Sequence, residues 1–210
     1  MSRRVFVLSP AYAGGQRARM IMSGRAQFDL ALRLREEGAS VAEIFTFLSG
    51  LYFRGKIAYA RVFGCVSPGI CSAIVITPTR GLIGAETRLH LDDLREFAGV
   101  DIDEEDPRYR KPLRRDARKL AKRLPKDVEI VLLGSIATGK YVDILLDSFG
   151  ERLRFPAEFV GRGDMSRGGL LLRSAADRQE LSYIPVAGAI RSGKRPPKLT
   201  PRRYPKSCPF

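Results

Sequence analysis

Three short apolar runs set the strongest limit on how this chain can fold. They are Val5–Leu8, Ala73–Thr77 and Glu129–Leu133, and each stops at a turn signal built from proline, glycine or serine. Continuous apolar runs are typical of strands that are covered on both faces, as in a parallel sheet. The sequence therefore predicts three buried strands.

Segments with helical spacing of apolar residues separate these runs. They are Ala26–Glu37, a helix capped by Ser40, Tyr52–Phe63, Leu91–Phe97, Pro112–Leu124 and Ala137–Phe149. Weaker strand patterns at Arg152–Phe155 and Tyr183–Val186 are expected at sheet edges. Strands that alternate with helices predict an α/β fold of three layers, in which a mostly parallel sheet is flanked by helices.

The composition changes near Ala189, where prolines alternate with lysines and arginines and no acidic residue occurs. Such a segment cannot bury a core. A length of 210 residues suits one domain. We therefore expect a single α/β domain over residues 1–188 and a basic, proline-rich tail over residues 189–210 that is extended or disordered.

The formal net charge of +14 favours polyanionic partners. Nucleic acid and nucleotides are the partners that we expect; the alternative is a basic protein with no such ligand. No run approaches the ~20 apolar residues of a membrane helix, so no membrane partner is expected. The oligomeric state does not follow from the sequence.

Cysteine and histidine usage narrows the possible chemistry. Cys65, Cys71 and Cys208 form no CxxC pair, which argues against a disulfide framework and a zinc site and favours a reducing, cytoplasmic location. His90 is the only histidine, so a multi-histidine metal centre is excluded. We predict no metal site and no cofactor.

In a parallel sheet, ligands bind outside the carboxyl ends of the strands. Polar turns follow the predicted strands there and carry groups suited to anions. The candidate ligand-binding residues are Ser9, Arg17, Thr77, Arg80, Gly134, Ser135, Lys140, Gly163, Ser166 and Arg167.

The segment Gly134–Lys140 has the phosphate-loop spacing GxxxxGK between a predicted strand and a predicted helix. Tyr141 stands where that motif needs a serine or threonine for Mg²⁺. The segment therefore predicts a simpler anion-binding turn at a helix start, and the alternative is a structural turn that needs small residues.

The glycine-rich segment Phe159–Gly169 is the most distinctive part of the chain. Asp164 or Ser166 is expected to cap a helix over Leu170–Ala176. Asp164 is also the candidate catalytic acid or base, and the alternative is an ordered structural loop.

Two segments have the composition of nucleic-acid contacts. The first contains Arg54 and Lys56 among aromatic residues that are also suited to a core. The second is the basic helix within Arg108–Lys126, which follows an acidic run that is expected to form a capped, solvated turn. Its alternative is a solvated face; its candidate residues are Arg114, Arg115, Arg118 and Lys122.

A resemblance covers residues 1–175 in the order of elements. The strings Ser49–Lys56, Ala58–Ala60, Ile76–Ile83 and Ile130–Gly134, with the basic helix between the last two, resemble an uncharacterised bacterial domain family. That family is in turn similar to the uracil-DNA-glycosylase-like domain of archaeosine synthase, a transfer-RNA base-modifying enzyme. The resemblance implies an α/β fold with a nucleoside-sized pocket. It transfers no catalytic residue, because the glycosylase Asp and His loops are not present.

The leading hypothesis is a nucleic-acid- or nucleoside-associated protein with a pocket at the strand ends. One alternative is a nucleotide-binding enzyme that acts on a small phosphorylated substrate through Gly134–Lys140. Another is a non-catalytic basic interaction protein. Whether the protein is an enzyme stays open at this level.

Overall fold

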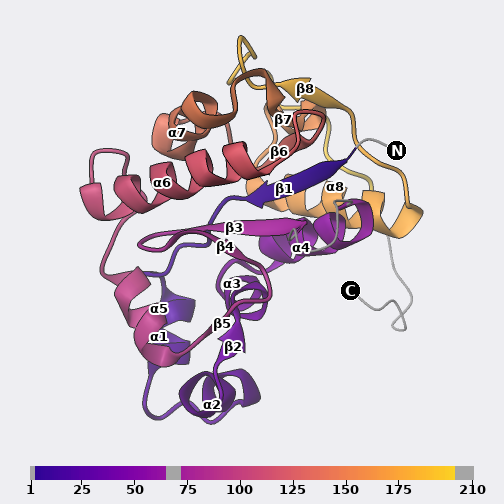
Figure 1. Cartoon of the computed structure of the whole chain (residues 1–210). Coiled ribbons are helices and arrows are strands. Elements are labelled where there is room, and N and C mark those ends of the chain that lie inside the picture. Colours follow the sequence, from indigo (N-terminus) through magenta and orange to yellow (C-terminus); the bar gives the residue numbers. More distant parts are fainter. Residues whose placement is uncertain (1–2, 65–71, 202–210) are drawn as a thin grey trace.

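The computed structural model describes residues 3–64 and 72–201. All three cysteines and the last nine residues of the predicted tail lie outside these ranges. The fold is α/β, as predicted: a six-stranded sheet in the order β4-β3-β1-β6-β7-β8 has helices on both faces (Figure 1). The strands are β1 (Arg4–Leu8), β3 (Ala73–Thr77), β4 (Gly81–Gly84), β6 (Glu129–Leu133), β7 (Leu153–Pro156) and β8 (Tyr183–Pro185).

The three apolar runs form the parallel centre of the sheet. Strand β1 lies between β3 and β6, with Val7 opposite Ile74 on one side and Leu132 on the other. All but the first residue of β1 and β6 are buried, as expected for strands covered on both faces. Strand β7 is parallel to β6, and the antiparallel strands β4 and β8 form the two edges. The prediction that Arg152–Phe155 is an edge strand is wrong, because Tyr183–Pro185 pairs with it.

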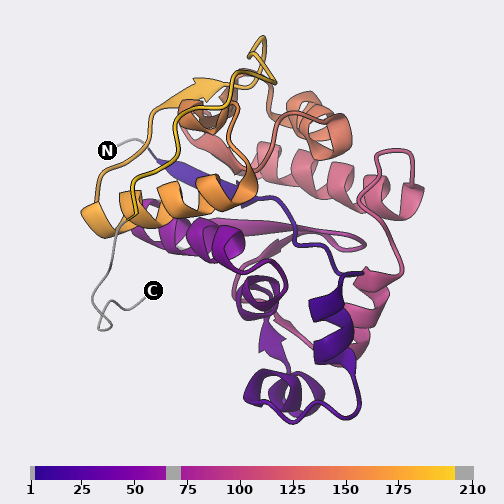
Figure 2. The same ribbon diagram turned by 180° about the vertical axis from the view of Figure 1, so that it is seen from behind.

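Helices cover the two faces of the sheet as pairs. The basic helix α6 (Pro107–Arg123) packs with α7 (Gly139–Phe149) on one face, and α4 (Leu51–Phe63) packs with α8 (Asp164–Asp177) on the other (Figures 1 and 2). The remaining elements gather below β3 in Figure 1. They are α1 (Gln16–Met22), α2 (Asp29–Glu36), β2 (Ala39–Ser40), α3 (Val41–Ser49), β5 (Arg88–Leu89) and α5 (Leu91–Ala98).

Local signals explain where several helices begin. Ser40 caps α3 as predicted, and does so within a capping box: Ser40 Oγ accepts from the Glu43 amide at 3.2 Å, and Glu43 accepts from the Ser40 amide. Helix α6 begins at Pro107, after the Asp106 cap, and not at Pro112 as predicted. Proline suits either position as a first residue, and Tyr109 extends the buried face one turn back.

Helix α8 is longer than the predicted Leu170–Ala176, because its glycines serve packing and not a loop. A Cβ on Gly168 would lie 2.8 Å from the carbonyl oxygen of Leu51, and one on Gly55 would lie 2.7 Å from the carbonyl oxygen of Gly168. The two glycines therefore let the backbones of α4 and α8 touch, at a place where any side chain would separate them.

The described part of the tail, residues 189–201, forms no helix or strand and follows the surface of α7 and α8. Arg191 pairs with Asp143 of α7 at 2.7 Å. Arg162 donates to the carbonyl oxygen of Pro197 at 3.4 Å, and Arg173 donates to that of Thr200. One ion pair and two hydrogen bonds to carbonyl oxygens thus hold this described segment.

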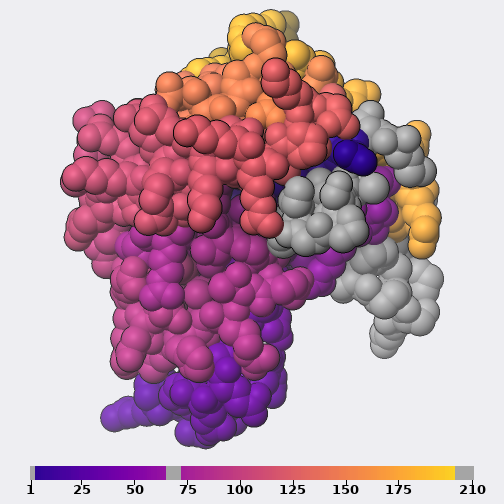
Figure 3. Space-filling model, in the orientation of Figure 1, coloured from indigo at the N-terminus to yellow at the C-terminus, as the bar shows by residue number. Residues whose placement is uncertain are grey.

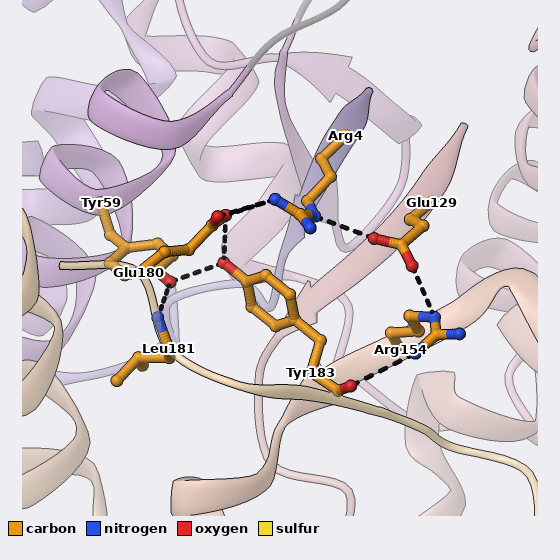
Figure 4. Close-up of polar contacts among 7 residues, drawn as sticks. All are labelled: Arg4, Tyr59, Glu129, Arg154, Glu180, Leu181 and Tyr183. Atoms are coloured by element: carbon orange, nitrogen blue, oxygen red, sulfur yellow. Dashed lines mark hydrogen bonds and ion pairs between the residues drawn. The ribbon is translucent and has the colours of Figure 1, made fainter. Parts of the chain in front are cut away.

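A chain of alternating charges closes the amino ends of the strands (Figure 4). Glu129 accepts from Arg4 and from Arg154, at 2.9 Å in each case. Arg4 also donates to Glu180 at 2.7 Å. Glu180 in turn accepts from the Tyr183 hydroxyl, which lies 2.5 Å from that of Tyr59 on α4.

No helix in the described ranges combines the length and the apolar character required to cross a bilayer.

Candidate functional site

A cleft of about 1020 Å³ opens at the carboxyl ends of β1 and β6. The chain leaves β1 toward β3 on one side, whereas the later strands β6 and β7 extend the sheet on the other side. The cleft therefore lies where the strand order reverses, which is the usual ligand position in open α/β sheets. The turn after β1, helix α1, and the first turns of α4, α7 and α8 form its walls.

The fold brings together four of the predicted ligand-binding residues and the predicted catalytic residue. Ser9, Arg17, Ser135, Lys140 and Asp164 all line the cleft. They come from the turn after β1, from α1, from the turn after β6, and from the starts of α7 and α8. Three segments that are distant in the sequence, at residues 9–17, 135–140 and 164, thus meet, as the parallel arrangement predicts.

Beneath the cleft, a buried lysine lies beside a buried serine that lines it. Lys56 of α4 is 1% exposed and Ser9 is 6% exposed. Lys56 Nζ lies 2.6 Å from Ser9 Oγ and 2.9 Å from the Ser9 carbonyl oxygen. It also lies 4.1 Å from the centre of the Tyr52 ring. No carboxylate of the described residues forms an ion pair with Lys56.

Burial lowers the pKa of Lys56 to about 7. The carboxylate of Asp164 opposes this shift, and the guanidinium of Arg167 adds to it. Near neutral pH the amine of Lys56 is therefore present in both protonation states. A buried lysine without an acidic partner is unusual, since lysine is seldom fully buried unless it is paired.

Two tyrosines flank this pair. The Tyr141 hydroxyl donates to the Ser135 carbonyl oxygen at 2.8 Å, and burial raises its pKa. The Tyr52 hydroxyl is buried and has no hydrogen-bond partner within the described residues, and burial raises its pKa as well. Both rings provide apolar surface next to groups that can hydrogen-bond.

Gly134 does not line the cleft but determines what packs beneath it. A Cβ at this position would lie 2.8 Å from Ser9 Cβ and 2.9 Å from the Tyr141 hydroxyl. A glycine is therefore required for Ser9 and Tyr141 to lie so close together. The turn provides no hydroxyl for Mg²⁺ at position 141, because the Tyr141 hydroxyl is buried and engaged with Ser135.

The rim of the cleft is charged and exposed. Arg17 is anchored by a hydrogen bond from Nη1 to the Phe47 carbonyl oxygen at 3.1 Å. Lys140 forms no ion pair or hydrogen bond with any described residue. Asp101 and Asp103, from the acidic run before α6, also line the cleft. Instead of only forming a solvated turn, this run contributes two carboxylates to the site.

Asp164 is the first residue of α8, and the capping role predicted for it or for Ser166 is wrong. The N-cap residue is Gly163, and no side chain caps the helix. Asp164 is held by Arg167 at 3.4 Å. Arg167 is buried and donates to the Phe159 carbonyl oxygen, and Ser166 accepts from Arg162. Gly163, Ser166 and Arg167 therefore support the cleft wall without lining it.

Thr77 and Arg80 do not join the cleft. Strand β3 turns back at once into β4, and the Thr77 hydroxyl donates to the Gly81 carbonyl oxygen within this turn at 3.1 Å. Arg80 pairs with Asp93 at 2.5 Å and with Glu96 at 2.9 Å, both on α5. The sequence analysis did not predict the β3–β4 hairpin. This hairpin directs the carboxyl end of β3 away from the carboxyl ends of β1 and β6.

The predicted nucleic-acid residues are divided by the sheet. Lys56 is buried beneath the cleft, which corrects its assignment to a surface that contacts a phosphate backbone. Arg54, also on α4, lines a separate hollow with Arg33 and Glu43. Helix α6 lies on the opposite face, where its exposed side forms part of the surface in Figure 3.

The basic face of α6 is only partly neutralised. Arg115 pairs with Asp116 at 2.8 Å and Arg118 pairs with Asp147 at 2.9 Å. Arg114 and Lys122 are exposed and have no ion pair or hydrogen bond in the described chain. These two side chains are therefore available to a ligand without loss of an internal contact.

Comparisons with protein-family models, curated proteins and solved structures found no match to this chain.

Proposed function

We propose that the cleft binds a nucleoside phosphate. The observation that carries this proposal is the division of the cleft into two parts: buried tyrosines on the floor and exposed cations on the rim, at the reversal of the strand order. An aromatic, uncharged floor suits a base, and Arg17 with Lys140 suits a phosphate. A cleft of about 1020 Å³ is large enough for both.

Asp164 supplies the polar specificity in this proposal. It is exposed at the cleft wall, and Arg167 fixes its position from below. A carboxylate accepts hydrogen bonds only, so it suits ribose hydroxyls or the N–H edge of a base. The family that the chain resembles is in turn similar to a domain of a base-modifying enzyme, which agrees with a ligand of this kind.

Helix α6 suggests how a polynucleotide could reach the cleft. The segment with Asp101 and Asp103 lines the cleft and leads into α6, where Arg114 and Lys122 are unpaired. We infer that a nucleotide in the cleft can belong to a longer strand whose phosphates lie along α6. Binding through α6 alone, without the cleft, is the second candidate function.

Titration of the full-length protein with nucleosides and their mono-, di- and triphosphates tests the cleft. Arg17→Ala and Lys140→Ala should each weaken binding of the phosphorylated ligands by about tenfold to a hundredfold, since a charge-assisted contact contributes about 1.5–3 kcal/mol. Arg19→Ala is the matched control, because Arg19 lies exposed on α1 outside the cleft. Equal affinities for all variants, or no binding to any nucleotide, would refute the proposal.

Fluorescence anisotropy with transfer RNA, single-stranded DNA and duplex DNA over a salt series tests the role of α6. Each of Arg114→Ala and Lys122→Ala should lower the slope of log affinity against log salt by about one. If Arg17→Ala and Lys140→Ala leave nucleic-acid affinity unchanged while the α6 variants reduce it, α6 binds without the cleft.

A further inference from the structure

The pair Ser9 and Lys56 has a geometry that nucleotide binding does not require. The amine nitrogen contacts two oxygens of the same residue, at 2.6 Å for the hydroxyl and 2.9 Å for the carbonyl. A neutral amine has two N–H groups and one lone pair. It can therefore donate to the Ser9 carbonyl while its lone pair accepts the Ser9 hydroxyl proton. In this arrangement a serine oxygen is already joined to a base.

Three further features of the structure favour a reaction at this pair. Gly134 gives Ser9 room against Tyr141. Lys56 is desolvated, with no carboxylate in ion-pair contact to keep it charged, and Asp164 and Arg167 of α8 act on it with opposite signs. The backbone N–H groups of Ala11 and Tyr12, in the cleft wall just after Ser9, donate to no acceptor within residues 3–64 and 72–201.

We propose that Ser9 is a nucleophile and Lys56 its general base, and that the pair hydrolyses a carboxylic ester or amide bound in the cleft. An acyl group suits this floor because Ser9, Tyr52 and Tyr141 are buried and uncharged there, whereas the cations lie exposed on the rim. Serine–lysine pairs perform acyl transfer on unrelated folds. The inference shares the cleft with the proposed function but does not depend on which ligand the rim binds.

The reaction balances with water as the only co-reactant. Ser9 Oγ forms a bond to the acyl carbon, its proton moves to Lys56 Nζ, and the carbonyl electron pair moves onto the carbonyl oxygen. The free N–H groups of Ala11 and Tyr12 are the candidates to stabilise that oxyanion. The tetrahedral intermediate then collapses, and the leaving alcohol or amine takes the proton from Lys56. Water next attacks the Ser9 ester, gives its proton to Lys56, and Lys56 returns it to Ser9.

Covalent labelling with a fluorophosphonate probe tests the pair, read by intact mass and peptide mapping of the full-length protein. We expect a single adduct on Ser9 and none in Ser9→Ala. Lys56→Met should slow labelling by about a hundredfold or more, in the range that removal of a general base costs. Lys126→Met, an exposed lysine after α6, is the matched control and should label at the wild-type rate.

The pH dependence of the labelling rate distinguishes a catalytic role of Lys56 from a purely structural one. It is measured on the wild-type protein, so it does not depend on whether a variant folds. The labelling rate should rise through pH 7 and level off above it, as Lys56 loses its proton. An absent Ser9 adduct, a flat profile from pH 6 to 9, or equal rates for Lys56→Met with an unchanged urea midpoint would overturn the inference. Parallel titration with nucleotides distinguishes the two proposals, because the probe carries no nucleoside. Labelling of Ser9 without nucleotide binding refutes only the proposed function. Nucleotide binding without labelling of Ser9 refutes only the catalytic role of Ser9 and Lys56.

Discussion

At the amino ends of the central strands, Arg4, Glu129 and Arg154 alternate in charge, whereas at the carboxyl ends Lys56 is buried beside the neutral oxygens of Ser9. The first arrangement satisfies every charge with an opposite one. In the second arrangement, the free-energy cost of burying the Lys56 amine depends on whether the amine is protonated. The two ends therefore differ: at one the charges are neutralised in pairs, and the other is where we propose chemistry.

Glu129→Ala should disrupt the charge network at the amino ends of the strands and have the largest effect on stability. It removes the carboxylate that Arg4 and Arg154 share, and leaves two partly buried guanidinium groups with fewer partners. We expect a loss of about 2–3 kcal/mol in the free energy of unfolding, measured with urea. The reactivity of Ser9 at the other end should not change. A loss no larger than that of an exposed pair such as Arg61–Glu86 would contradict this view of the amino end.

Gly134→Ala tests how closely the carboxyl end is packed. The added methyl group must displace Ser9 or the Tyr141 hydroxyl. We expect a cost of about 2 kcal/mol and slower labelling of Ser9. Gly24→Ala is the control, because a Cβ at that position has nothing within 4 Å. Equal effects of the two variants would show that the close contact beneath Ser9 is unimportant.

The stability of wild type relative to Lys56→Met should depend on pH. The pKa of Lys56 is about 7 in the folded state, against 10.5 for the ordinary value, so between these limits the unfolded chain binds a proton that the folded chain does not. Stability therefore rises with pH in this window, by about 1–2 kcal/mol from pH 7 to 8.5. Urea unfolding of both proteins at the two pH values measures this change. An unchanged difference would mean that Lys56 stays protonated when it is buried.

Tyr59→Phe should have the smallest effect. The Tyr59 hydroxyl accepts from the Leu181 amide at 2.8 Å and contacts the Tyr183 hydroxyl, which keeps other partners. We expect a loss of about 1 kcal/mol by thermal or urea unfolding, which is the low end for two hydrogen bonds at about 0.5–1.5 kcal/mol each. A loss as large as that of Glu129→Ala would mean that the amino-end network acts as one unit.

Much of the fold follows from local patterns, and the exceptions have identifiable causes. The apolar runs predict the bounds of the central strands within a residue, because a short continuous apolar run is typical of a strand that is covered on both faces. The hairpin strand Gly81–Gly84 escapes prediction because two of its four residues are glycines. The first turns of α8 escape because Gly168 disfavours a helix locally and is selected by the contact with α4.

Only part of the candidate site could be predicted from the sequence. Ser9, Lys140 and Asp164 follow from the rule about strand ends, but Lys56 does not. It lies 47 positions from Ser9, and its aromatic neighbours suggest either a core or a surface that stacks on bases. A lysine in the middle of a buried helix is the one signal that could have revealed it, since such a lysine needs a specific partner.

The contact between Gly55 and Gly168 has a consequence for motion. Gly55 is next to Lys56, which lies beneath the cleft, and Gly168 is four residues from Asp164, which lines it. Because the two backbones touch there, the helices must shift together, and they carry the amine and the carboxylate as one rigid part. Lys140 belongs to α7, on the other face of the sheet. Opening of the cleft should therefore change the distance from Lys140 to Asp164 while the distance from Lys56 to Asp164 stays nearly constant.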